Sequence, residues 1–214
     1  EILHQIVEEF YEDLGERINE DNYQIAEEKL IDIAYDVISS YQMFKDNFYW
    51  QTEGYRYLQN NQLGPVFKEF LAAEKKAKLS RTKIDDFNFK KAERQFEALE
   101  VIEDYKFSGR VDRIDHSLEK DVYGVIDYKS GKVTNKNLTT NPIQIPLYIM
   151  AVEKYFDKEV AFGSYYGLRV DDKIGYKKVI NSGRIQKSNQ DKKDKEFRLK
   201  LEESKELIKS CIEG

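Results

Sequence analysis

The chain has 214 residues, of which 40% are hydrophobic, 13% aromatic and 35% charged, and its formal net charge is -5 at pH 7. This length and this apolar fraction are sufficient for one domain with a sizeable core. No apolar run approaches the roughly 20 residues that a membrane-spanning helix needs, and no charged-then-apolar leader opens the chain, so we expect a soluble, cytoplasmic protein without a membrane partner.

Helical periodicity dominates the first 80 residues. A first helix is predicted to end before Gly15, and a second one runs from about Ile25 to Tyr41. Pro65 follows Gly64 and suits the first turn of a third helix, which we expect to continue to about Leu79. We therefore predict a helical amino-terminal layer over residues 1–80, followed by a polar connection over residues 80–90.

The hydrophobic period changes to two between about residues 92 and 129. Three strands are predicted there, around "ERQFEAL", "FSGRVDRID" and "VYGVIDYK", and we expect them to form an antiparallel meander. Helical spacing returns in "NPIQIPLYIMAVEKYF", two more strands follow in "VAFGSYYGLR" and "GYKKVI", and residues 190–213 form a charged helix. We predict a single α/β domain over residues 1–214, with its sheet core at 88–180 and a final helix at 190–214. The first residue is Glu1, which is compatible with a fragment of a longer protein.

An acid and an amine lie two residues apart on the third predicted strand. Side chains alternate along a strand, so Asp127 and Lys129 share one face while Ile126 and Tyr128 occupy the other. Asp112, on the preceding strand, can approach Asp127, and two neighbouring carboxylates repel unless a cation lies between them. Oxygen ligands favour Mg²⁺ or Mn²⁺, and an adjacent lysine can stabilise negative charge on a phosphate. This arrangement is suited to phosphodiester hydrolysis.

Charge is unevenly distributed along the chain. Residues 1–70 carry 15 acidic and 5 basic side chains, whereas residues 169–200 carry 5 acidic and 11 basic ones. The basic stretch is a candidate surface for a polyanion, but taken alone it is better explained as a solvated, lysine-rich loop and helix. Beside a phosphate-directed site, we expect the stretch from Arg169 to Lys200 to follow the phosphate backbone of DNA.

Three motifs occur in a fixed order: Gly-x-x-Asp-Arg at 109–113, Asp-Tyr-Lys at 127–129 and Gln-x-x-x-Tyr at 144–148. In this order they closely resemble the PD-(D/E)XK nuclease superfamily, specifically its RecB-like exonuclease branch. That branch includes the nuclease domains of AddA, AddB and RecB and the nucleases of CRISPR adaptation. The resemblance implies a restriction-endonuclease-like core, with a central mixed sheet flanked by helices. It also implies a metal-dependent deoxyribonuclease, an exonuclease acting in DNA repair or recombination.

The resemblance assigns the central residues. Asp112 matches the first metal ligand, Asp127 the second and Lys129 the catalytic lysine, while the backbone carbonyl of Tyr128 is usually a further ligand in this family. The implied cofactor is Mg²⁺ or Mn²⁺, and the implied substrate is DNA, either single-stranded or as duplex ends. Two alternatives remain: a CRISPR-adaptation or phage-type nuclease, and a DNA-end-binding domain that has lost its activity. Retention of all three charged residues speaks against the second alternative.

Four further residues match family positions outside these strands. Gln144 and Tyr148 share a helical face, where they could position DNA, brace the active-site lysine or simply pack. "ILHQIVEEFYEDL" looks like the first helix of the family, in which a histidine, here His4, completes the metal site. Neutral imidazole suits Mn²⁺ better than Mg²⁺. Glu93 matches a recurring acidic position, and we expect it to support the ligands without contacting the metal.

The chain departs from parts of the family in its cysteines. Many AddB-type and CRISPR-associated members bind an iron-sulfur cluster through one cysteine before the domain and three after it, whereas this chain contains only Cys211. We expect no iron-sulfur cluster within this chain, so it belongs to a cluster-free branch or the ligating cysteines lie outside it. It also lacks a Walker A sequence, so a helicase would be a partner subunit or another domain.

Overall fold

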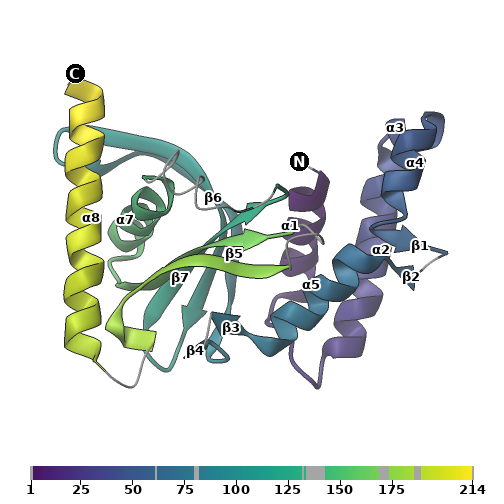
Figure 1. Cartoon of the computed structure of the whole chain (residues 1–214), viewed down its shortest axis with the longest axis horizontal. Helices are drawn as coiled ribbons and strands as arrows, with labels where there is room; N and C mark the ends of the chain where they lie inside the picture. Colours follow the sequence, from purple (N-terminus) through teal and green to yellow (C-terminus); the bar gives the residue numbers. More distant parts are fainter. Residues whose placement is uncertain are drawn as a thin grey trace.

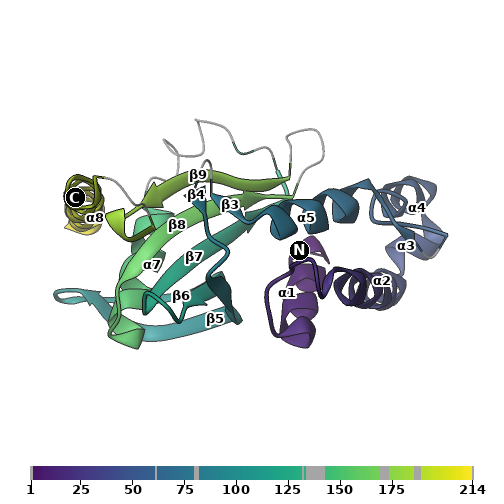
Figure 2. The same cartoon turned by 90° about the horizontal axis from the view of Figure 1, so that it is seen from below.

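The computed structural model describes residues 2–60, 62–79, 82–131, 133, 143–168, 174–185 and 189–213. Its centre is a five-stranded sheet with the order β5-β6-β7-β8-β9. Helices α1, α2 and α5 lie to one side of this sheet, and α7 and α8 lie to the other (Figures 1 and 2). The prediction of an α/β fold with a central sheet flanked by helices is confirmed.

The sheet is mixed because of one crossover. Strands β5 (Phe87–Ile102), β6 (Tyr105–Ser117) and β7 (Val122–Lys129) form the predicted antiparallel meander. Strand β8 (Val160–Gly167) pairs with β7 in parallel, so the chain must cross one face of the sheet between them, and it does so through α7 (Gln144–Phe156). Strand β9 (Gly175–Asn181) then pairs antiparallel with β8.

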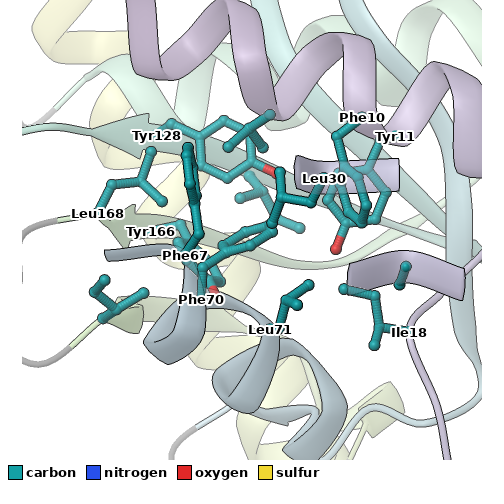
Figure 3. Packing of buried hydrophobic residues seen from close by; sticks show 14 of the residues in the cluster. Phe10, Tyr11, Ile18, Leu30, Phe67, Phe70, Leu71, Tyr128, Tyr166 and Leu168 are labelled. Carbon is teal, nitrogen blue, oxygen red and sulfur yellow. The ribbon is translucent and has the colours of Figure 1, made fainter. Parts of the chain in front are cut away.

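The amino-terminal helices bury their apolar stripes against the sheet and one another. Helix α1 (Ile2–Leu14) buries Phe10 and Tyr11, α2 (Tyr23–Ser40) buries Leu30, and α5 (Pro65–Lys76) buries Phe67 and Phe70. These side chains pack in one cluster with Tyr128 and Tyr166 from the sheet (Figure 3). The spacing of apolar residues predicted α1 and α2, and Pro65 begins α5 as expected.

Two predictions in this half of the chain are wrong. Helix α5 ends at Lys76, three residues early, because Ala77 adopts a left-handed conformation (φ 46°) and its N–H bonds to the carbonyl of Ala73. The expected polar connection then contains a hairpin, β3 (Lys78–Leu79) with β4 (Thr82–Lys83), and β5 already begins at Phe87. Two more pairs of short elements were not predicted: helices α3 (Met43–Asp46) and α4 (Phe48–Gly54), and strands β1 (Leu58–Gln59) and β2 (Gln62–Leu63).

Helix α7 lies close against β8. A side chain at Gly163 would bring a Cβ within 2.4 Å of Ile145 Cγ2 and 2.8 Å of Ile149 Cδ1, so glycine permits this approach. Helix α8 (Gln190–Glu213) covers the outer part of the same layer and buries Phe197 and Leu201. The contact of α7 with β8 holds the amino-terminal end of α7, and therefore Gln144, over the sheet.

Among the described residues, no helix combines the length and the apolar character needed to cross a bilayer.

Candidate active site

The two central strands stop pairing at the predicted aspartates. The β6–β7 ladder ends at the pair Arg113 and Ile126, and the next positions along the two strands are Asp112 and Asp127. Asp112 bridges the resulting gap, because its Oδ2 accepts a hydrogen bond of 2.8 Å from the backbone N–H of Tyr128. The structure thus brings the two carboxylates together where the strands diverge.

Asp127 is a buried carboxylate held by Gln144 and Lys129. The residue is 2% exposed, and its Oδ1 accepts from Gln144 Nε2 at 3.0 Å. Its Oδ2 forms an ion pair with Lys129 Nζ at 2.5 Å. Burial, with the neighbouring charge of Asp112, raises the pKa of Asp127 to about 6, although Lys129 opposes this shift. A cation beside these carboxylates would offset the unfavourable free energy of burying two neighbouring negative charges.

This raised pKa predicts the pH dependence of stability without metal. An unfolded aspartate titrates near a pKa of about 3.9, so the folded protein binds an extra proton between this pH and about 6. The stabilisation is complete below the unfolded pKa and is lost as pH rises through about 6. Relative to Asp127→Asn, the wild type should lose on the order of 1–3 kcal/mol between pH 4 and pH 7. Urea unfolding of both proteins in EDTA measures this difference, and parallel pH curves would contradict the assignment.

Helix α7 contributes the pair Gln144 and Tyr148. Gln144 donates from Nε2 to Asp127 and to the hydroxyl of Tyr148 (3.1 Å), and its Oε1 accepts from Lys129 Nζ at 3.3 Å. The amide therefore contacts both charged residues of the Asp-x-Lys motif. Of the roles considered for this pair, bracing the lysine has direct geometric support.

Tyr165 belongs to the same cluster and was not predicted. It lies opposite Asp127 in the β7–β8 ladder, its hydroxyl donates to Gln144 Oε1 at 3.5 Å, and its ring centroid is 5.2 Å from Lys129 Nζ. Burial, together with Asp127, raises the pKa of Tyr165 to about 12, so the hydroxyl keeps its proton. The sequence places Tyr165 on a strand but does not give the register that aligns it with Asp127.

His4 reaches the site from α1. Its ring centroid lies 6.1 Å from that of Tyr128, and its charge interacts with those of Asp112 and Lys129. Burial lowers the pKa of His4, which favours the neutral imidazole that a metal requires. Within the described ranges, no group of three or more His, Cys, Asp or Glu side chains is assembled to hold a metal ion. Two carboxylates and a carbonyl still fit Mg²⁺, which often binds through one or two carboxylates and keeps several waters.

Glu93 and Arg110 form an ion pair beside Asp112. Glu93 Oε2 contacts Arg110 Nε, and the glutamate side chain is only 9% exposed. Burial, followed by the charge of Glu8, raises the pKa of Glu93 to about 6, and Asp112 adds to this shift. The structure therefore places Glu93 near the candidate ligands. Arg110 was not singled out from sequence, although strand alternation puts it on the face of Asp112.

Arg113 anchors the same strand from the opposite face of the sheet. It is 2% exposed, donates to both oxygens of Asp115 at 2.7 and 2.8 Å, and donates to Glu74 at 2.7 Å. Tyr11 also donates to Glu74. Burial acts to raise the pKa of Glu74, but Arg113 and the hydrogen bonds outweigh it and lower this pKa. The network joins α1, α5 and β6 and is structural.

The basic stretch of residues 169–200 contains several ion-paired cations. Arg184 contacts Glu159 at 2.6 Å, Arg198 contacts Glu153 at 2.8 Å, and Lys193 lies 3.4 Å from Glu196. Arg169 and Lys173 lie outside the described residues. Glutamates thus offset part of the positive charge of this stretch, and its role in binding DNA stays a prediction.

The fold is a mixed sheet flanked by helices, as in restriction-endonuclease-like domains. The sequence matches the family model of the PD-(D/E)XK nuclease superfamily over residues 1–213. The chain therefore belongs to the PD-(D/E)XK nuclease superfamily. Membership implies a nuclease with DNA as its substrate, and nucleases of this superfamily typically use divalent metals. A comparison with curated protein sequences found no significant match.

Proposed function

We propose that this protein is a Mg²⁺- or Mn²⁺-dependent DNA exonuclease of RecB-like type. The observation that carries this proposal is the convergence of Asp112, Asp127 and Lys129 where β6 and β7 diverge. A buried carboxylate with a raised pKa beside a second carboxylate is a costly arrangement for stability alone. It is explained if a cation and a phosphate occupy the site during function.

Each residue then has a distinct task. Asp112, Asp127 and the carbonyl of Tyr128 would hold the cation, with His4 as a further ligand, and Glu93 would support them. The bound metal supplies positive charge and acidifies a water molecule. Lys129 donates from Nζ to the phosphate as its negative charge develops. Gln144 fixes the lysine and Asp127 through one amide, and Tyr148 and Tyr165 fix that amide.

The proposed setting is cytoplasmic DNA repair or recombination, with a helicase subunit or domain that delivers the DNA strand. A CRISPR-adaptation or phage-type nuclease would use the same residues with a different partner. A DNA-end-binding domain without activity is disfavoured because both carboxylates and the lysine are present, with Lys129 in contact with Asp127 and Asp112 bonded to the backbone between them.

End-labelled single-stranded and duplex DNA, incubated with Mg²⁺, Mn²⁺ or EDTA, tests the proposal. We expect cleavage with either metal, none with EDTA, and early release of terminal nucleotides from one labelled end. Internal cuts without terminal products would replace the exonuclease by an endonuclease. Metal-dependent binding without any cleavage would identify the inactive end-binding domain instead.

A further inference from the structure

Arg110 is an exposed arginine next to the candidate site. It precedes Asp112 by two residues on β6, so both side chains lie on one face of the sheet, about 7 Å apart along the strand. The Arg110 side chain is 59% exposed. Burial raises the pKa values of Glu8 on α1 and of Tyr148 on α7, and the positive charge of Arg110 opposes both shifts. Burial lowers the pKa of His4 on α1, and Arg110 adds to that shift. Arg110 therefore lies within electrostatic reach of both helices that border the site.

The surroundings of Arg110 are strongly acidic. Glu8, Glu93, Asp112 and Asp127 all interact electrostatically within this region. An anionic backbone that approaches them needs cations at the entrance as well as inside, because each carboxylate repels it. Lys129 supplies a positive charge inside the site, where its side chain is only 30% exposed. Arg110, with a side chain that is 59% exposed, can supply a second positive charge at the edge of the site.

Glu93 holds Arg110 in position without covering it. The ion pair uses Arg110 Nε, and the high exposure of the side chain leaves its terminal amino groups accessible to a ligand. A guanidinium can donate to two acceptors at once and matches the geometry of a phosphate. The nearly buried carboxylate of Glu93 thus restrains the guanidinium of Arg110, which lies on the same face of β6 as Asp112.

We propose that Arg110 is a phosphate-binding residue, which contacts the DNA backbone next to the phosphate being cleaved. This inference rests on the proposed function, since it takes DNA as the substrate. Arg110 would fix the strand relative to the metal site, and Glu93 would preorganise Arg110.

Salt dependence of DNA binding tests this role. Binding of a fluorescein-labelled 20-nucleotide single strand is measured by anisotropy in Ca²⁺, over a series of KCl concentrations. Arg110→Gln should weaken binding and reduce the slope of log K against log salt by about 0.7, the value for one lost phosphate contact. Arg110→Lys should retain the wild-type slope. The matched control is Arg56→Gln, which removes another exposed arginine paired with a glutamate, Glu53, after α4 rather than on the sheet that holds the site. Its slope should equal that of the wild type.

Arg110→Gln leaves the nearly buried carboxylate of Glu93 without its partner and could destabilise the fold. A second variant therefore separates a loss of folding from the loss of a phosphate contact. The double variant Glu93→Gln/Arg110→Gln removes both charges and leaves the net charge unchanged, and it should show the same reduced slope. A wild-type slope in the double variant, or an equal reduction in Arg56→Gln, would overturn the proposal. If the wild type itself neither binds nor cleaves DNA, the proposed function fails, and this inference fails with it. If the wild type cleaves DNA but Arg110→Gln and the double variant both keep the wild-type salt slope, only the phosphate contact of Arg110 is overturned and the proposed function stands.

Discussion

Asp127→Asn should lower the single-turnover rate of DNA cleavage by roughly 100-fold or more, because the loss of a metal ligand removes several kcal/mol of transition-state stabilisation. Asparagine retains the size of the side chain and an oxygen that can accept from Gln144. It removes the negative charge that a cation needs. The fold should persist, since the neutral amide relieves the burial of a charged group at 2% exposure.

Asp121→Asn is the matched control for this loss. Asp121 precedes the same strand, but its side chain is 58% exposed and contacts Lys158 at the surface. We expect its cleavage rate to stay within twofold of the wild type. Both rates are measured with enzyme in excess over end-labelled DNA, and circular dichroism confirms folding. A folded Asp127→Asn protein that cleaves at the wild-type rate would remove Asp127 from the active site.

Arg113→Met should reduce the free energy of unfolding by roughly 3–5 kcal/mol, the cost of breaking a buried ion pair by removing one partner. Arg113 neutralises Asp115 and Glu74, which are 1% and 2% exposed. Methionine fills a similar volume but leaves both carboxylates without their shared guanidinium. Urea unfolding at pH 7 measures the change.

Arg198→Met provides the comparison at the surface. Arg198 also makes two contacts of 2.8 Å with one glutamate, Glu153, yet its side chain is 44% exposed. An exposed pair contributes at most about 1 kcal/mol, so this variant should lose much less stability. Equal losses in the two variants would show that the network around Arg113 is not a buried structural anchor.

The larger elements could be predicted because their periodicity is strong. The apolar stripe from Leu3 to Leu14 indicates burial of one helical face, and α1 buries that face. The run "VYGVIDYK" is rich in strand-forming residues, and β7 forms there with both of its faces buried. The hairpin of β3 and β4 could not be predicted in this way, since two-residue strands have no period. Its position depends instead on the left-handed turn at Ala77.

The contacts of the candidate site also differ in how far the sequence predicts them. Residues within one strand, such as Asp127 and Lys129, have relative positions fixed by alternation and could be predicted to contact each other. Tyr165 could not, because its contact with Gln144 depends on the register of a parallel pair and on the approach of α7. Arg110 was open to prediction from alternation, but its significance depends on its ion pair with Glu93, which lies on a different strand.

The most direct test of the metal site is a crystal structure of the protein with Mn²⁺ and an anomalous difference map. We predict one peak within coordination distance of the carboxylates of Asp112 and Asp127 and of the carbonyl of Tyr128, with His4 as an additional ligand. A peak without His4 would leave the site intact and make that histidine a packing residue. Saturating Mn²⁺ with no peak between the two aspartates, or with a peak held elsewhere, would contradict the assignment of a metal-dependent nuclease site to this part of the chain.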